Sequence, residues 1–308
     1  MTSDTADPRT SDTADPRPVR GSSPVPFGPA LSSAAHWPVD RAAAVVVDPQ
    51  GPIDWIGEPD WVTRIASIAK LLVGYACLVA LEEGTVRLED ACGPPGSTLR
   101  HCLAHASGLA FNRATTGRAE RVRAVGTRRI YSNLGIEAAA EHLATSAGME
   151  FEEYLQAGVL APLAMTATEL RGSPAYAVWS SAADLARLAQ ELLAPTLISQ
   201  ATLALARTPQ FPGLPGIVPG LPGWLRPCPW GLGFELKLNK ARHWTGTRNS
   251  AATFGHFGGA GTFLWVDPEP QIAVVALTDR EFGDWALDVW PRFSDAVLCA
   301  DREFRRIS

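Results

Sequence analysis

Ser67 and Lys70 carry the strongest chemical signal in the sequence, within the stretch Ser67-Ile68-Ala69-Lys70. Ser67 precedes an almost wholly apolar run, residues 68–81, in which Lys70 is the only charged residue. Residues three apart lie on one face of a helix, so the hydroxyl and the amine are expected to be neighbours. An amine buried in such a helix tends to lose its proton and can then act as a base. The pair predicts a serine nucleophile activated by a lysine.

The scarcity of lysine makes Lys70 more conspicuous. Lysine occurs only at positions 70, 237 and 240, and we expect Lys237 and Lys240 to be solvated strand or turn residues. A structural interpretation of the pair is also open: Ser67 would cap the helix, and the Lys70 side chain would extend to the surface. The apolar surroundings favour the catalytic interpretation, because an unpaired buried ammonium is costly.

Three later stretches hold residues that could complete the site. In chain order they are Leu103-Ala104-His105-Ala106-Ser107-Gly108-Leu109, Tyr131-Ser132-Asn133 and Gly255-His256-Phe257-Gly258, the last followed by Gly259. Two of them also have a purely structural interpretation. Asn133 could cap a helix that begins near Leu134, and His256 could be a histidine of the core.

Together these residues resemble the serine beta-lactamase and penicillin-binding-protein superfamily, and within it the branch of class C beta-lactamases, carboxylesterases and DD-peptidases. Ser67 and Lys70 match its SxxK pattern, and the Leu103 stretch is similar to its LLxHxSGL segment, which shapes a turn. The Tyr131 stretch resembles YxN, and the His256 stretch resembles the strand that carries Lys/His-Thr/Ser-Gly. Residues 179–185 also fit the helical lobe of that family, and the resemblance covers about residues 40–300.

The resemblance implies a role for each matched residue. Ser67 would attack a substrate carbonyl, and Lys70 would take its proton directly or through Tyr131. Tyr131 would pass a proton to the leaving group and help to activate water, with its phenolate stabilised by the Lys70 cation. The backbone N–H groups of Ser67 and Gly259 would form the oxyanion hole, and Asn133 would bind a substrate amide or orient Lys70. His256 and Gly258 belong to the strand that binds substrate.

The strand at His256 departs from the family pattern. Beta-lactamases and DD-peptidases place a lysine and a hydroxyl there, whereas this chain has His256, mostly neutral at pH 7, and the apolar ring of Phe257. We therefore expect weak recognition of a substrate carboxylate. The predicted function is a serine hydrolase of small esters or amides. Beta-lactamase or DD-peptidase activity is one alternative, and a ligand-binding or sensor module without turnover is another.

The elements that position these residues predict an α+β fold. Strands are expected at residues 42–47, 53–56, 233–238, 252–257, 262–266 and 272–278. A helix is expected at 67–83, and an apolar stripe at helical spacing runs from Trp285 to Ala300. Because strands at both chain ends enclose a helical middle, we expect one antiparallel sheet built from both ends and flanked by helices, with a helical second lobe at about 98–206.

The remaining chain divides into a tail, one domain and one long loop. Residues 2–9 repeat without change at 10–17, and this polar sequence predicts a disordered tail over residues 1–35. Residues 36–308 are expected to form a single domain. Seven prolines between 208 and 230 exclude a regular helix or central strand there, and a loop of this length could act as a lid. Trp224 and Trp230 in this loop could line an apolar acyl pocket, and simple packing of the loop onto the domain is the alternative.

Composition excludes several classes of partner. The 308 residues carry a net charge of -5, which does not favour binding to the negatively charged backbone of nucleic acid. No apolar stretch approaches the roughly 20 residues that span a bilayer. The N-terminus lacks the pattern of a secretory signal, and five cysteines without a CxxC pair suit reduced thiols, so we expect a cytoplasmic protein. His101 and His105 lack a third zinc ligand, and we predict neither a metal nor another cofactor. The oligomeric state stays open.

Overall fold

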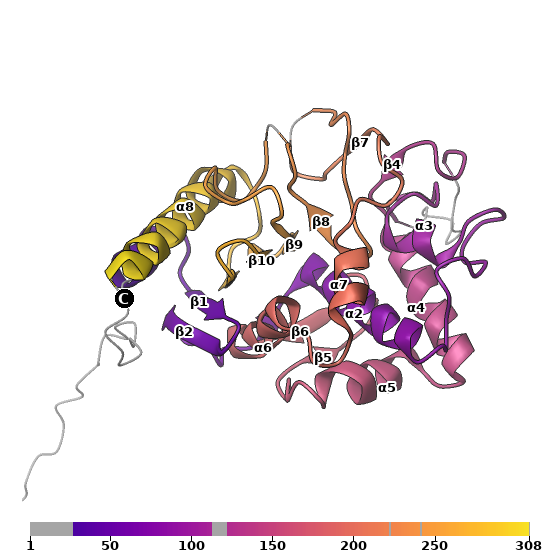
Figure 1. The fold of residues 1–308 in the computed structure, drawn as a ribbon, viewed down its shortest axis with the longest axis horizontal. Coiled ribbons are helices and arrows are strands. Elements are labelled where there is room, and N and C mark those ends of the chain that lie inside the picture. The colour runs from indigo at the N-terminus through magenta and orange to yellow at the C-terminus, as the bar shows by residue number, and fades with distance from the viewer. Residues whose placement is uncertain (1–26, 113–121, 222, 241, 308) are drawn as a thin grey trace, which may run out of the picture.

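The computed structural model describes residues 27–112, 122–221, 223–240 and 242–307, and it confirms the predicted α+β fold class (Figure 1). The helices are α1 (Gly28–Ser32), α2 (Ala69–Glu82), α3 (Leu99–Leu103), α4 (Asn133–Ala147), α5 (Phe151–Leu155), α6 (Ala182–Leu193), α7 (Gln200–Ala206) and α8 (Asp284–Ile307). Shorter turns are the 3₁₀ turns η1 (Ser33–His36) and η2 (Ala66–Ile68) and the π-helical turn η3 (Gln156–Leu160).

The main sheet has six strands in the order β2-β1-β11-β10-β9-β8. They are β1 (Ala42–Asp48), β2 (Gly51–Ile56), β8 (Glu235–Leu236), β9 (Phe254–Gly258), β10 (Thr262–Asp267) and β11 (Ile272–Thr278). All of their pairings are antiparallel, and β1 from the start of the chain pairs with β11 near its end, with Val45 opposite Val275. One sheet therefore joins both ends of the chain, as the sequence predicts.

Helices α6 and α8 cover opposite faces of this sheet (Figure 1). Alternate strand residues point to opposite faces, so Val45 and Val275 face the side of α6, whereas Val46 and Val274 face Trp290 of α8. Because both faces are covered, β10 and β11 are buried along their whole length. Burial of both faces holds the sheet as a rigid platform beside α2.

Helix α2 is the central helix of the helical part of the molecule and contacts α4, α5 and α7. Its residues from Ala69 to Ala80 are all buried, as its all-round apolar sequence predicts. Gly74 permits the close approach of residues 232–233, since a Cβ there would lie 3.0 Å from the Gly233 Cα. The Lys70 side chain is fully buried, so the interpretation that places its amine at the surface is wrong.

Two small sheets lie outside the main sheet. One has the order β3-β6-β5, built from β3 (Thr63–Arg64), β5 (Glu169–Leu170) and β6 (Val178–Ser180). The other pairs β4 (Arg129–Ile130) in parallel with β7 (Gly216–Ile217), inside the proline-rich segment. The predicted helical lobe at 98–206 thus holds α3 to α7 together with three short strands.

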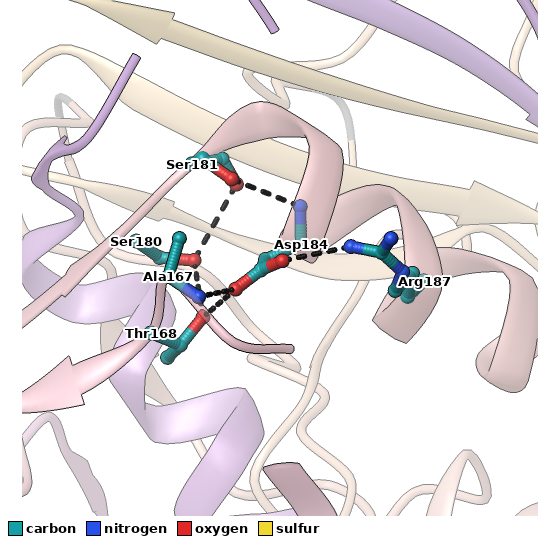
Figure 2. A network of polar contacts seen from close by, with 6 residues as sticks. All are labelled: Ala167, Thr168, Ser180, Ser181, Asp184 and Arg187. Carbon is teal, nitrogen blue, oxygen red and sulfur yellow. Dashed lines mark hydrogen bonds and ion pairs between the residues drawn. The ribbon is translucent and has the colours of Figure 1, made fainter. Parts of the chain in front are cut away.

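A polar network at the start of α6 fixes the neighbourhood of β6 (Figure 2). The Ser181 hydroxyl caps the helix by accepting the Asp184 N–H at 3.1 Å. The Asp184 carboxylate accepts bonds from the Ala167 N–H and the Thr168 hydroxyl, both at 2.8 Å, and the Thr168 hydroxyl also lies 2.8 Å from that of Ser180. Since β6 pairs with β3 and β3 leads into Ser67, the network supports the segment that carries the nucleophile.

The predicted disordered tail at 1–35 is wrong for its last residues. Residues 28–36 form α1 and η1, and Phe27 and Leu31 are buried in the cluster that contains α8. Trp37 packs edge-on against Phe293, with ring centroids 5.1 Å apart. These apolar residues follow the polar repeat closely and stabilise the segment by burial. The repeat at 2–17 lies outside the described residues. Across the described part of the chain, no helix is long and apolar enough to cross a membrane.

Candidate active site

Ser67 lies in η2, directly before α2, on a backbone that is tightly constrained. The preceding residue, Ala66, has a left-handed φ of 47°, which is strained for a residue with a side chain. Ile65 is held on both sides, because its N–H donates to Val178 O at 3.0 Å and its carbonyl accepts the Thr262 hydroxyl at 3.0 Å. The N-cap of α2 is Ile68, so the structural interpretation of Ser67 as a helix cap is wrong.

Gly258 of β9 faces this segment at close range. A Cβ on Gly258 would lie 2.3 Å from the Ile65 carbonyl oxygen, so only glycine fits beside the nucleophile segment. At Gly259 a Cβ would meet no atom within 4 Å. Its carbonyl accepts the Phe282 N–H at 3.0 Å, which orients the turn after β9. The role of the Gly259 N–H in an oxyanion hole stays a prediction.

Lys70 meets Ser67 as the sequence predicts. Its Nζ lies 3.0 Å from the Ser67 Oγ and donates to the Ala175 carbonyl at 2.8 Å. Burial lowers the pKa of Lys70 well below its ordinary value of 10.5, and the negative charge of Glu137 only partly opposes this shift. A neutral amine next to a hydroxyl can accept its proton.

Glu137 belongs to the site although none of the sequence motifs includes it. The Ser173 hydroxyl donates to Glu137 Oε1 at 2.6 Å and accepts the Ala175 N–H at 3.3 Å. The carboxylate therefore helps to orient Ala175, whose carbonyl accepts the hydrogen bond from the Lys70 amine. Glu137 lies four residues after Asn133 on α4, a spacing that places both on one helical face and could have indicated it.

Tyr131 lies against both Lys70 and His256. Its hydroxyl is 3.3 Å from His256 Nε2, its ring centroid is 4.8 Å from Lys70 Nζ, and Ser67 is a hydrogen-bonding partner of its hydroxyl. Burial raises the pKa of Tyr131 above its ordinary value of 10.0. The two pKa directions favour the neutral forms of the amine and the phenol, in agreement with the base predicted from the burial of Lys70 and in contrast to the ammonium and phenolate that the resemblance implies.

His256 is a neutral hydrogen-bond acceptor for Tyr131. Its Nδ1 lies 2.6 Å from the Phe257 carbonyl, which can only accept, so Nδ1 carries the proton and Nε2 is free to accept one from the Tyr131 hydroxyl. Burial, helped by the nearby Lys70, lowers the pKa of His256 to about 3. The residue is both satisfied within the core and part of the site, and it offers no positive charge to a substrate.

The two polar side-chain atoms of Asn133 differ in their hydrogen bonding. Its Nδ2 donates to Asn112 Oδ1 at 2.7 Å, whereas its buried Oδ1 has no hydrogen-bond partner within the described residues. The cap of α4 is Ser132, whose hydroxyl accepts the Gly135 N–H at 3.0 Å, so Asn133 is not the cap. Its contact with a substrate amide stays a prediction.

Within residues 103–109, His105 contacts both Tyr131 and the residue that follows it. His105 has a φ of 55° and accepts the Ser132 N–H on its Nδ1 at 3.1 Å, which fixes the segment after Tyr131. Its ring centroid lies 4.6 Å from that of Tyr131. His101 contacts a different partner, the Thr98 hydroxyl, at 2.8 Å. The two histidines of the HxxxH spacing therefore serve separate backbone turns.

The two tryptophans of the proline-rich segment have different surroundings. Trp224 is half exposed and lines a pocket beside Tyr131. Trp230 is buried and packs edge-on against the rings of His105, Tyr131 and His256. Trp224 thus fits the predicted pocket lining, and Trp230 fits the alternative of simple packing.

Lys240 is buried, so the prediction that it is a solvated residue is wrong. Its side chain is 1% exposed and donates to Glu235 Oε1 at 2.6 Å. The Trp244 indole N–H donates to the other oxygen of that carboxylate at 2.9 Å. The charge is buried because Glu235 supplies an opposite charge inside the fold, a contact five residues away that the spacing alone did not reveal. The pair lies next to Trp230, with Nζ 5.6 Å from its ring.

Comparisons with known proteins agree with this geometry. The beta-lactamase family matches residues 42–296. A beta-lactamase structure from Mycobacterium bovis is 48% identical, covers 88% of this chain and 99% of its own, and superimposes with a TM-score of 0.85. A putative beta-lactamase from Bacteroides dorei (17% identity, 90% and 99% covered, TM-score 0.75) and a mutant simvastatin synthase from Aspergillus terreus (18%, 89% and 93%, 0.72) share the fold. No curated protein matches the chain.

Proposed function

The chain belongs to the beta-lactamase family, whose members are serine hydrolases and acyltransferases, and we propose that it hydrolyses small esters or amides through an acyl-enzyme on Ser67. One observation carries the proposal: the Lys70 amine is fully buried, has a lowered pKa and lies 3.0 Å from the Ser67 Oγ. Such an amine is a base poised at the nucleophile.

The proton movements follow from the contacts of three residues. Lys70 accepts the hydroxyl proton as Ser67 Oγ bonds to the substrate carbonyl carbon. Tyr131 gives its proton to the leaving oxygen or nitrogen as that bond breaks, and the phenolate regains a proton from the Lys70 ammonium. Water then attacks the acyl carbon, loses its proton to the same groups, and releases the acid with Ser67 protonated again. His256 supports Tyr131 by accepting its hydrogen bond in the resting state.

The uncharged side chains of His256 and Phe257 on β9 favour esters over beta-lactams as substrates. His256 has a pKa of about 3 and Phe257 is apolar, so neither side chain can pair with the carboxylate that beta-lactams carry. A second candidate function is beta-lactam hydrolysis, and the 48% identical protein from Mycobacterium bovis, described as a beta-lactamase, favours it.

We expect kcat/KM for p-nitrophenyl butyrate to exceed that for nitrocefin by about tenfold or more, because the ester does not need a cation on β9. Steady-state hydrolysis of both substrates by the full chain measures this ratio. Comparable turnover of nitrocefin would instead assign beta-lactamase activity. Intact-mass spectra recorded during the reaction separate a third case, since a stable acyl adduct with no released acid identifies a sensor.

Glu137→Gln is expected to move the acid limb of the kcat/KM profile to lower pH. Lys70 must be neutral to accept a proton, so activity falls as the pH drops through its pKa. The Glu137 charge raises that pKa, and its removal lowers it further, while glutamine still accepts the Ser173 hydroxyl. The raised pKa of Tyr131 keeps the phenol protonated, so no alkaline limb is expected near neutral pH.

Ester hydrolysis measured across about pH 4 to 9 locates this limb. Glu141→Gln is the matched control, since Glu141 is an exposed residue one turn further along α4 and its loss should leave the profile in place. An acid limb at the same pH in Glu137→Gln and wild type would show that Lys70 does not control it.

A further inference from the structure

A pocket of about 350 Å³ lies beside Tyr131, on the side of the site that faces the proline-rich segment. This volume lies within the usual range for small-molecule sites, roughly 300 to 1,000 Å³. Most of its lining is apolar or aromatic, and Phe111 extends the aromatic surface of Tyr131, with ring centroids 5.8 Å apart. The apolar lining residues are Phe111, Val122, Ile130, Ile217, Pro219 and Trp224.

The charged residues of this pocket are all arginines. Arg123 and Arg128 are exposed at its rim, and Arg129 is buried beneath them. No carboxylate occurs among its described lining residues, and none of the three arginines belongs to an ion pair in the described part of the chain. This local excess of positive charge contrasts with the net charge of -5 of the whole chain.

The three arginines differ in how free their guanidinium groups are. Each of the three guanidinium nitrogens of Arg129 donates to a backbone carbonyl: to Cys228 O at 3.0 Å, to Gln210 O at 2.8 Å and to Ala104 O. Arg129 therefore adds positive potential while its nitrogens are held by the protein. Within the described residues, the Arg123 guanidinium donates only to Val122 O at 2.7 Å, and the Arg128 guanidinium lies 5.3 Å over the ring of Trp224. These two groups keep donors that a ligand can use.

We propose that this pocket makes the enzyme selective for anionic esters, whose apolar chain lies along Phe111, Trp224 and Ile217 and whose distal carboxylate or phosphate binds Arg123 and Arg128. The proposal rests on the proposed function, because Tyr131 joins the pocket to Ser67. Guanidinium groups bind both kinds of anion through paired hydrogen bonds. The rim of the pocket thus supplies the positive charge that β9 lacks, at the far end of the substrate.

The test compares esters that differ only at the distal end. The probes are p-nitrophenyl hexanoate, mono-p-nitrophenyl adipate and p-nitrophenyl ω-phosphonopentanoate. We expect wild-type kcat/KM for the better anionic ester to exceed that for hexanoate by about tenfold at low salt, and the better of the two identifies the anion. The preference should shrink as the salt concentration rises, because exposed charges are screened.

The double variant Arg123→Gln/Arg128→Gln should reduce the ratio of anionic to neutral turnover to about one, since the charge is lost while the chain contacts remain. Because this ratio compares two substrates within one variant, a loss of stability that lowers both turnover rates equally cancels. Arg292→Gln is the matched control, because Arg292 is an exposed arginine on α8, and it should keep the wild-type ratio. Equal turnover of all three esters by wild type, or an anionic preference that survives the double variant, overturns the proposal.

A binding measurement separates this proposal from the proposed function. In the Ser67→Ala background, each ester is titrated while the fluorescence of tryptophan, including the half-exposed Trp224, is recorded. Tighter binding of an anionic ester that depends on Arg123 and Arg128 supports the pocket even where wild type hydrolyses no ester. Equal affinity for the neutral and anionic esters overturns the pocket even where hydrolysis is observed.

Discussion

Ser67→Ala is expected to lose acyl-enzyme formation completely and to reduce kcat/KM for esters by at least about a thousandfold. The variant removes the only hydroxyl that lies within hydrogen-bond distance of the Lys70 amine in the described structure. What remains is an apolar helix end with a base but no nucleophile. Intact-mass spectra after treatment with a fluorophosphonate probe, together with hydrolysis of p-nitrophenyl butyrate, measure both losses.

Ser199→Ala provides the control for this experiment. Ser199 caps α7 by accepting the Thr202 N–H at 3.1 Å and is exposed, so its loss should cost about 1 kcal/mol of stability and leave labelling intact. A single adduct that persists in Ser67→Ala and maps to another residue would assign the nucleophile elsewhere and refute the proposed mechanism.

Lys70→Met is expected to abolish activity and to change the pH dependence of stability. The pKa of Lys70 is lowered in the folded chain from an ordinary value of 10.5, so the unfolded chain binds a proton that the folded chain does not. The resulting cost is absent above that ordinary pKa. It grows by about 1.4 kcal/mol for each pH unit below it, until the pH reaches the folded pKa. Methionine removes this cost.

The two proteins should therefore exchange their order of stability with pH. At high pH the variant is less stable by about 1 kcal/mol, because the Ala175 carbonyl loses its donor. As the pH falls, wild type becomes the less stable protein. Free energies of unfolding from denaturant titrations at several pH values measure the crossing, and kcat/KM for the ester should fall by at least about a thousandfold in the same variant.

Lys240→Met serves as the contrasting variant, because the other buried lysine is paired. Its amine lies 2.6 Å from Glu235, and its removal leaves a buried carboxylate without a positive partner. Such a change costs about 3 to 5 kcal/mol, so this variant should be less stable than wild type. A parallel pH dependence in Lys70→Met and wild type would show that Lys70 keeps its proton in the folded chain, contrary to the proposed base.

The sequence was sufficient wherever the relevant distance is local along the chain. Ser67 and Lys70 are three residues apart, and a helix that is apolar on all sides must be buried, so both their contact and the burial of Lys70 follow from spacing and composition. The strands of the main sheet were predictable for the same reason, since their apolar runs and turn residues are local signals. The resemblance to a family then placed Tyr131 and His256 in the same site.

Other features could not be predicted because they depend on what surrounds each residue in space. Glu137 acts on Lys70 through Ser173 and Ala175, which come from a different segment of the chain. The burial of Phe27 and Leu31 depends on α8 at the far end of the sequence. A helix propensity or a hydropathy value carries no information about such partners.

The protonation states of the site were decided only by the tertiary structure. The sequence missed the Glu137 carboxylate but indicated the other three titratable groups of the site: an amine, a phenol and an imidazole. Packing then removed water from all three, which lowers the pKa of Lys70 and His256 and raises that of Tyr131. Desolvation is set by every atom around a charge, so the sequence could indicate a buried basic amine at Lys70, but only the folded environment sets how far its pKa falls.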